Sequence, residues 1–349
     1  MPQTATIDNR VTRLMMETLE EGLARLWARP VRIRELRREF LSSSSSFRTE
    51  RLRVTLDRGR PLRVFFKDLN PRNQMGKART VREFDLEPSY RELQMYQSVL
   101  SPERFGTLHL YAFRWEPDLG RYWIFLEDGG RTTLHNDLDM PLWIEAARWA
   151  AHFHAVTREL PVGRTSFLPR YDQAHYRRCA ERVEHILPNL NAQERELVER
   201  GLDCYAECID WLSALPRCVI HGQFFGKNIM LRRGHGAPRI AVIDWETAAL
   251  GPGTFDLVSL TSGKWTQEQR RTMWTAYFQQ YEAEAGRPME WEAFCSELAG
   301  VALYQSLEWL AWWGHHRSLS RHFERFMWEL GAALEEHFTT GATRAKEAG

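Results

Sequence analysis

The chain has 349 residues, of which 43% are hydrophobic and 27% charged, and its 47 basic and 46 acidic residues leave a net charge of +1. This balance is typical of a globular protein and excludes the strong positive field by which proteins bind nucleic acid or anionic membranes. No apolar run reaches the roughly 18 residues of a membrane span, and the polar residues 1–10 do not resemble a secretory signal. Five cysteines, an odd number with no CxxC pair, favour reduced thiols in a cytoplasmic protein.

The first 127 residues have the pattern of an antiparallel sheet with one inserted helix. Apolar residues recur at helical spacing over 8–28 and again over 89–100. Five short runs with alternating apolar residues predict strands at 31–41, 48–56, 62–69, 107–115 and 121–127. The connections between these runs are mostly short, which favours antiparallel pairing.

From residue 142 onward the pattern is mainly helical. It predicts helices at 142–157, 174–186, 192–214, 266–284, 290–313 and 318–338. One β-rich stretch, 218–260, interrupts them. At roughly 150 residues per domain, the length predicts about two lobes. We expect an α+β chain with a small sheet lobe (31–128) and a larger helical lobe (129–338), preceded by an N-terminal helix (1–30) and followed by a frayed tail (339–349).

Two polar residues in the β-rich stretch indicate a metal site. Asn228 and Asp244 each border a short apolar run, at 229–231 and 240–243. Their amide and carboxylate oxygens could converge on one hard cation. Mg²⁺ accepts few protein ligands and completes its coordination shell with phosphate oxygens and water. The pair therefore predicts a magnesium ion held next to a phosphorylated ligand.

The same stretch resembles the catalytic and metal-binding loops of a known family. His221-Gly222 is followed by Asn228 at the spacing of the motif His-Gly-Asp-x-x-x-x-Asn, and Ile243-Asp244-Trp245 matches the strand end that comes after it. This pattern is typical of the aminoglycoside phosphotransferase and choline kinase branch of the protein-kinase-like fold. Lys67, Glu92 and the segment 126–129 match further anchors of that family in the same order, so the resemblance covers about residues 31–260.

The resemblance implies a two-lobed kinase-like fold that binds ATP or another nucleoside triphosphate with Mg²⁺. Lys67 would hold the α- and β-phosphates, steadied by Glu92, while Asn228 and Asp244 would bind the metal. The backbone at Glu127–Gly129 would bind the edge of the base. The run 42–46 would replace the glycine-rich lid and offer phosphate contacts from Ser43, Ser44 and Ser45.

Gln223 stands where this family has its catalytic aspartate. An amide carries no charge and cannot accept a proton at neutral pH. The protein could bind nucleotide without transferring phosphate. Alternatively, Gln223 could orient the acceptor, because phosphoryl transfer depends mostly on positioning and electrostatics. In a third reading the acceptor is already anionic, as a carboxylate or phosphate is, so it needs no base and an aspartate would repel it.

Several of these residues also have purely structural interpretations. Lys67 could be an edge-strand charge, and Ser42–Ser46 a flexible linker. Glu92 could cap its own helix through Ser89, in which case Glu83 would be the alternative partner of Lys67. Asp256 is expected to cap the helix that follows it, and His154 to be a buried helix histidine.

The acceptor side is the least specified part of the sequence. Glu246 is the nearest carboxylate that could replace the missing base, although it could equally brace its loop. Most aromatic residues of the last third recur at the helical spacing that is typical of core residues. Several of them lie close together at one helix end near His315 and His316, where they could form an aromatic wall for a flat or hydrophobic small molecule. The candidate substrate residues are Glu246, Trp265, Glu308 and Trp312.

Together these features predict a Mg-ATP-dependent small-molecule phosphotransferase in specialised metabolism or self-resistance. The catalytic set would be Lys67, Gln223, Asn228 and Asp244. The segment between Asp244 and Asp256 is too short to dock a protein substrate in the manner of signalling kinases. A nucleotide- or ligand-binding protein without activity and a nucleotidyl transferase are the alternatives.

Overall fold

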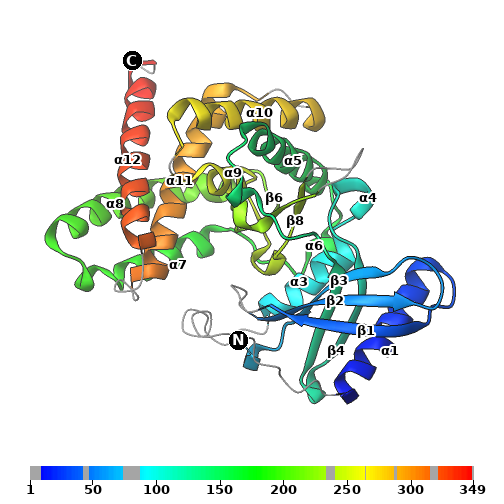
Figure 1. Cartoon of the computed structure of the whole chain (residues 1–349). Helices are drawn as coiled ribbons and strands as arrows, with labels where there is room; N and C mark the ends of the chain where they lie inside the picture. Colours follow the sequence, from blue (N-terminus) through cyan, green and yellow to red (C-terminus); the bar gives the residue numbers. More distant parts are fainter. Residues whose placement is uncertain are drawn as a thin grey trace. The chain divides into compact units, whose positions relative to one another are not determined.

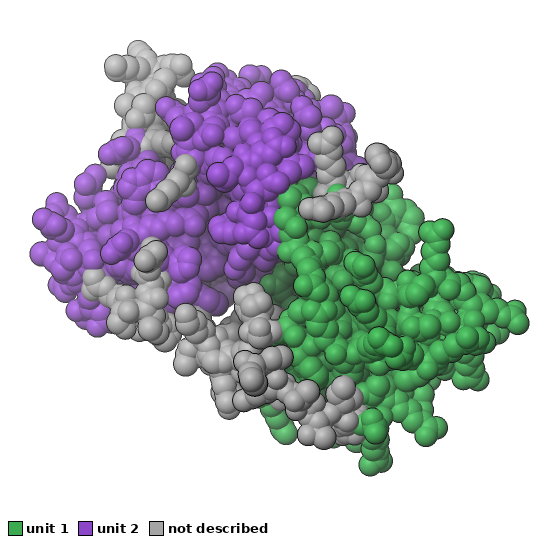
Figure 2. Space-filling view, in the orientation of Figure 1, with its two compact units in different colours: residues 1–132, 230–246 green, residues 133–229, 247–349 purple. Residues whose placement is uncertain are grey.

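The computed structural model describes residues 9–41, 47–73, 87–232, 240–263, 265–286, 289–314 and 321–347. Figure 1 shows the elements, and Figure 2 colours the two compact units into which the chain divides. Unit 1 comprises Met1–Thr132 and Met230–Glu246, and unit 2 comprises Thr133–Ile229 and Thr247–Gly349. The segment that carries Asp244 thus belongs to unit 1, whereas the sequence pattern predicts it within the helical lobe 129–338.

Unit 1 is built on a five-stranded antiparallel sheet, which confirms the predicted sheet. Its spatial order is β1-β2-β3-β5-β4, and each pair of neighbours is antiparallel. The strands are β1 (Ile33–Phe40), β2 (Arg48–Leu56), β3 (Leu62–Asp68), β4 (Leu110–Glu116) and β5 (Arg121–Glu127). Each strand lies within three residues of its predicted bounds, because alternating apolar residues mark the buried face directly.

One face of this sheet is covered by helix α1 (Asn9–Trp27). Met15 and Leu19 of α1 are fully buried and pack with Leu52, Val54 and other strand residues in one apolar core. A side chain at Gly22 would lie 2.3 Å from the carbonyl oxygen of Tyr111, so glycine permits the close approach of α1 to β4. The N-terminal helix is therefore part of unit 1 and not a separate segment.

The remaining elements of unit 1 are short. Helix α3 (Glu87–Ser98) corresponds to the predicted helix, and α4 (Pro102–Phe105) was not predicted. Ser101 caps α4 by accepting a hydrogen bond from the Arg104 N–H. Strands β7 (Ile229–Leu231) and β8 (Ile240–Val242) form a second, two-stranded sheet.

Unit 2 is mainly helical. Its helices are α5 (Met140–Arg158), α6 (Val162–Thr165), α7 (Gln173–Glu184), α8 (Ala192–Ala214), α9 (Thr254–Thr261), α10 (Gln267–Ala285), α11 (Trp291–Gly314) and α12 (Arg321–Glu347). Strands β6 (Cys218–Ile220) and β9 (Ala249–Gly251) pair antiparallel among them. Helix α12 continues to Glu347, so most of the tail expected to be frayed at 339–349 is helical.

Local sequence signals explain where two of the long helices begin. Asn191 with Glu194 starts α8, and Thr266 with Gln269 starts α10, each as a reciprocal capping box. One apolar core joins α7, α8, α11 and α12. None of the helices in the described part of the chain combines the length and hydropathy that a membrane-spanning segment requires.

Candidate active site

Lys67 is the centre of a buried charged cluster in unit 1. Strand β3 presents Lys67 with only 4% of its surface exposed. Its Nζ atom lies 2.7 Å from Glu92 Oε2 of α3 and 2.7 Å from Asp244 Oδ1, just beyond β8. Lys67 is therefore not an edge-strand charge, and Glu92 forms the expected ion pair. Because α3 begins at Glu87, Glu92 lies inside this helix and not at its start.

A third carboxylate belongs to this cluster. Glu246 is 2% exposed, and carboxylate oxygens of Glu92, Asp244 and Glu246 all lie within 4.8 Å of one another. The backbone carbonyl of Glu246 also accepts a hydrogen bond from Arg91 Nη1 at 3.0 Å. Glu246 was expected on the acceptor side, but it is buried beside Lys67. Converging carboxylate oxygens are the donor set that a hard divalent cation prefers.

The cluster controls the ionisation of its members. Burial alone would lower the pKa of Lys67, but the carboxylates of Asp244 and Glu92 outweigh it and raise that pKa above its ordinary value. Burial raises the pKa of Glu92, and the charge of Lys67 offsets part of this rise. Lys67 therefore remains positively charged at every pH at which the protein would operate.

Asp244 has an unusual backbone conformation for a residue with a side chain. Its φ angle is +70°, in the left-handed region that aspartate tolerates better than bulky residues but that costs conformational energy. This conformation turns the chain sharply after β8, where Asp244 meets Lys67. The sequence could not reveal this feature, since an aspartate after a strand is compatible with many backbone conformations.

The predicted catalytic loop of unit 2 is fixed by a buried carboxylate of that unit, Asp256. Asp256 is 1% exposed and accepts hydrogen bonds from the backbone N–H of His221 at 2.6 Å and of Gly222 at 3.0 Å. His154 Nε2 lies 3.0 Å from the same carboxylate, and His154 is fully buried, as predicted. Asp256 is structural, but the helix cap expected of it is wrong: α9 begins at Thr254, and Asp256 fixes the loop instead.

Gly222 is required by the path of this loop. Its φ angle is +80°, and a Cβ atom there would lie 2.3 Å from the carbonyl oxygen of Thr247. A residue with a side chain would therefore be both strained and obstructed. His221 braces the loop as expected, because its Nδ1 atom accepts a hydrogen bond from the Gln223 N–H at 3.2 Å.

Gln223 and Asn228 are joined through the backbone of the loop. Asn228 is 5% exposed, and its Nδ2 atom donates to the Gln223 carbonyl oxygen at 2.9 Å. This bond uses the amide's donor end, so the Oδ1 atom is the end left for a cation. The Gln223 side chain is half-buried and makes no hydrogen bond to the described residues, which leaves its amide available to a ligand.

The segment Glu127–Gly129 follows β5 in unit 1. The Glu127 N–H donates to the His109 carbonyl at 2.8 Å, and the Asp128 N–H donates to the Arg63 carbonyl at 3.3 Å. Within the described part of the chain the Gly129 N–H has no such partner. Of these three backbone donors, only that of Gly129 is available to the edge of a nucleotide base.

Two predicted acceptor residues of unit 2, Trp265 and Trp312, pack against different aromatic residues. Trp265 packs edge-on against Trp143 of α5, with ring centroids 4.7 Å apart. Trp312 packs against Trp309 of the same helix at 5.8 Å, and Trp309 contacts Phe225 of the catalytic loop at 5.6 Å. The aromatic wall therefore includes a loop residue that the sequence analysis did not single out.

Glu308 lies next to this wall. Its Oε1 atom is 3.5 Å from Arg182 Nη2 of α7, and its side chain is 20% exposed. Burial raises the pKa of Glu308, and Arg182 offsets part of the rise. The remaining residues considered from the sequence lie outside the described residues: Ser43, Ser44, Ser45, Glu83, His315 and His316.

Comparisons with known proteins identify the family and the fold of this chain. The chain is 29% identical over 217 residues to the N-acetylmuramate/N-acetylglucosamine kinase of Neisseria meningitidis serogroup B, and this match spans 58% of each chain. The fold is similar to that of a choline kinase from Cryptosporidium parvum Iowa II, with a TM-score of 0.58 at 10% identity over 97% of each chain. It is also similar to an aminoglycoside phosphotransferase solved with ADP, with a TM-score of 0.51 at 15% identity over 96% of this chain and 99% of that one. The profile described as the phosphotransferase enzyme family matches residues 115–291, just over half of the chain. The chain therefore belongs to the phosphotransferase enzyme family and has a kinase-like fold.

Proposed function

We propose that the protein transfers the γ-phosphoryl group of a magnesium-bound nucleoside triphosphate, ATP in the first instance, to a small molecule. The observation that carries this proposal is the Lys67 cluster, in which one buried ammonium lies 2.7 Å from both Glu92 and Asp244. Glu246 brings a third carboxylate into the same place. Carboxylates that crowd one another in this way repel unless a cation joins them.

Each residue has a distinct role in this proposal. Asp244 binds the magnesium ion, and Asn228 contributes its Oδ1 atom as a second ligand. Magnesium supplies positive charge that neutralises the phosphate oxygens as the bond to the leaving group breaks. Lys67 holds the non-transferred phosphates with a charge that its carboxylate neighbours maintain, and Glu92 keeps the Lys67 side chain in position.

The nucleotide base is proposed to lie against Glu127–Gly129, with the Gly129 N–H donating to its edge. The solved aminoglycoside phosphotransferase with ADP supports nucleotide use by this fold. A Cβ atom at Gly129 would lie 3.3 Å from side-chain atoms of Leu108 and Met230, so glycine fits the close packing of this segment against both residues.

Gln223 favours an acceptor that is already anionic. Two like charges 4 Å apart repel by about 4 kcal/mol at an effective dielectric constant of 20, which corresponds to roughly a thousandfold in rate. An aspartate at position 223 would impose this penalty on a carboxylate or phosphate nucleophile, whereas glutamine does not. The aromatic wall at Phe225, Trp309 and Trp312 would then bind the apolar part of the acceptor.

A panel of acceptors tests both the activity and the role of Gln223. Amino sugars such as N-acetylmuramate and N-acetylglucosamine are one arm, since a relative of this chain is a kinase named for them. Small carboxylates and phosphates are the other arm. ADP release that depends on an acceptor supports the proposal, whereas release of AMP and pyrophosphate would instead indicate a nucleotidyl transferase.

The variant Gln223→Asp then separates the two acceptor classes. With a hydroxyl acceptor, the new carboxylate can serve as the base, and the rate should rise. With an anionic acceptor, the rate should fall by up to the thousandfold estimated above. If no acceptor supports turnover while Mg-ATP still binds, the protein is a nucleotide-binding protein without transfer activity.

A further inference from the structure

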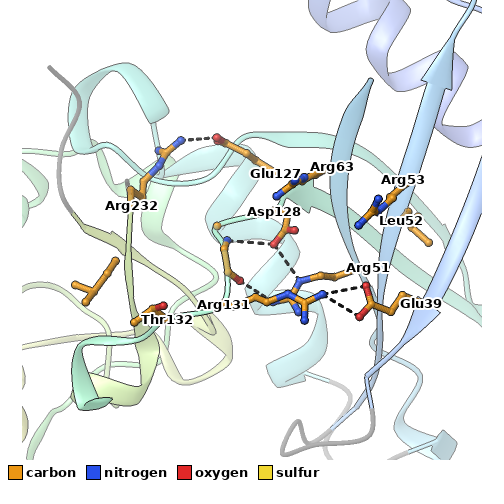
Figure 3. Close-up of a pocket in the computed structure, with 13 residues that line it drawn as sticks. Glu39, Arg51, Leu52, Arg53, Arg63, Glu127, Asp128, Arg131, Thr132 and Arg232 are labelled. Atoms are coloured by element: carbon orange, nitrogen blue, oxygen red, sulfur yellow. Dashed lines mark hydrogen bonds and ion pairs between the residues drawn. The ribbon is translucent and has the colours of Figure 1, made fainter. Parts of the chain in front are cut away.

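Unit 1 contains a second charged site, a pocket with a volume of about 580 Å³ (Figure 3). Arg63 of β3 lines this pocket, and it stands on the same face of the strand as Lys67, because residues 63, 65 and 67 alternate with the buried Val64 and Phe66. Four residues of extended strand separate Arg63 from Lys67 by roughly 13 Å. The pocket thus lies apart from the Lys67 cluster, but Glu127, Asp128 and Gly129 also line it, so it adjoins the segment proposed above for the nucleotide base.

Three of the five arginines that line the pocket are neutralised. Arg51 Nε lies 3.3 Å from Asp128 Oδ1, and Arg51 Nη2 donates to the Gly130 carbonyl at 2.6 Å. Arg131 lies 2.9 Å from Glu39.

Arg232 is the third, and it forms an ion pair with Glu127. Glu39, Glu127 and Asp128 are the carboxylates that line the pocket, and each of them therefore already has an arginine partner. No lining carboxylate remains for the other two arginines.

Arg53 and Arg63 are those two. They are directly opposite one another on β2 and β3, and both are exposed. Within the part of the chain that the structure describes, neither forms an ion pair or a side-chain hydrogen bond, and no dashed contact in Figure 3 reaches either of them. Arg37 continues this row on β1, where it pairs with Glu35. Like charges directly opposite on neighbouring strands destabilise a sheet.

We propose that this pocket binds a phosphate group carried by a small molecule, with Arg53 and Arg63 as the groups that recognise it. Two unpaired guanidinium groups match the charge of a phosphate dianion, and each planar fork can donate two parallel hydrogen bonds to its oxygens. The volume exceeds that of a bare ion and suits a ligand of metabolite size.

The phosphate could belong to either of two kinds of ligand. It could be carried by a separate phosphorylated metabolite that binds alongside the nucleotide. It could instead be part of one ligand that extends along the face of β3 from Lys67. The chemistry recognised by Arg53 and Arg63 is the same, and competition distinguishes the two sources.

Calorimetric titration of the whole protein with pyrophosphate, in EDTA and at low salt, tests the site without requiring activity. We expect Arg53→Gln/Arg63→Gln to weaken binding at least tenfold and each single variant to weaken it less. The matched control is Arg58→Gln/Arg60→Gln in the turn of the same hairpin, which removes the same charge from exposed positions outside the pocket. It should change the affinity by less than twofold.

Three results would overturn the proposal. They are a wild-type protein that does not bind pyrophosphate, binding that is unchanged in the Arg53/Arg63 double variant, and binding that both double variants weaken equally. Unchanged binding would indicate that pyrophosphate occupies the Lys67 cluster. If binding is lost as proposed, repeating the titration with saturating Mg-ATP identifies the source. Unchanged affinity indicates a separate ligand, and exclusion indicates a ligand that overlaps the nucleotide, either along the face of β3 or at Glu127–Gly129.

Discussion

Buried carboxylates occur in both units, and the contrast between them separates structure from function. In unit 2, Asp256 receives two backbone N–H groups and contacts His154, so its oxygens are satisfied by the protein itself. In unit 1, Glu92 and Asp244 share one lysine, and Glu246 lies within 4.8 Å of both. A satisfied carboxylate fixes a loop, whereas converging carboxylates around one ammonium provide a place for a bound cation.

The largest effect should follow from Asp244→Asn, which keeps the shape of the side chain but removes its charge. We expect the phosphoryl transfer rate to fall roughly a thousandfold or more, because a charged group of the transition-state environment is lost. Steady-state kinetics with a working acceptor measures this. Asp118→Asn, at an exposed turn, should leave the rate unchanged. Equal activity of both variants would contradict the role of Asp244.

Lys67→Met should give the largest loss of stability in unit 1. It leaves Glu92 and Asp244 without their shared ammonium, and breaking a buried ion pair from one side costs about 3 to 5 kcal/mol. Chemical denaturation measures the free energy of unfolding. The double variant Lys67→Met/Glu92→Gln should recover part of the loss, since it removes one of the unpaired charges. No recovery would mean that Glu92 and Lys67 are not energetically coupled.

Asp256→Asn should act on unit 2 in a different way. The amide has one acceptor oxygen where the carboxylate has two, so its NH2 group faces one of the two backbone N–H donors, and the negative charge is lost as well. We therefore expect the free energy of unfolding to fall by about 1 to 3 kcal/mol. Asp203→Asn on the exposed face of α8 is the matched control. If Asp256 were a metal ligand, its loss would instead abolish the effect of magnesium while leaving stability intact.

A change of pH should produce a smaller, graded effect. Burial, together with the positive charges of Arg182 and Arg178, lowers the pKa of His175 in α7 from 6.5 to about 4. The unfolded chain therefore takes up a proton before the folded one does. This difference removes up to roughly 3 kcal/mol of stability as the pH falls from about 6.5 to 4. Lys67 stays charged throughout this window.

Replacing His175 with asparagine tests this assignment. The variant should be less stable at pH 7, because it loses the 2.7 Å contact to the Tyr304 hydroxyl, but its stability should vary less between pH 7 and 4. Thermal unfolding across this pH range measures both effects. An unchanged pH profile would mean that other groups determine the acid sensitivity.

Much of the sheet could be predicted because alternation and short connections are local properties of the sequence. Lys67 and Asp244 could be identified because they belong to spaced motifs. The choice between two roles for Glu92 could not be made, since a capping box and an ion pair require the same residue type. Only the helix start at Glu87 and the 2.7 Å contact to Lys67 decide it.

The features that were missed depend on contacts between distant segments. Asp256 receives donors from residues that precede it by more than thirty positions, so the local sequence suggested only a cap of the helix that follows it. Glu246 follows Asp244 by only two residues, and the backbone turn at Asp244 decides which way it faces. The pairing of Arg53 with Arg63 depends on the register of the hairpin around the turn 57–61.

Binding of Mg-ATP tests the central claim most directly. If the Lys67 cluster holds a magnesium-bound triphosphate, Mg-ATP at a hundred times its Kd should stabilise the wild-type protein by about 2.7 kcal/mol, visible as a higher Tm. EDTA or Asp244→Ala should remove this rise. An unchanged Tm of the wild-type protein with saturating Mg-ATP, or an equal rise in the Asp244→Ala variant, would contradict the account.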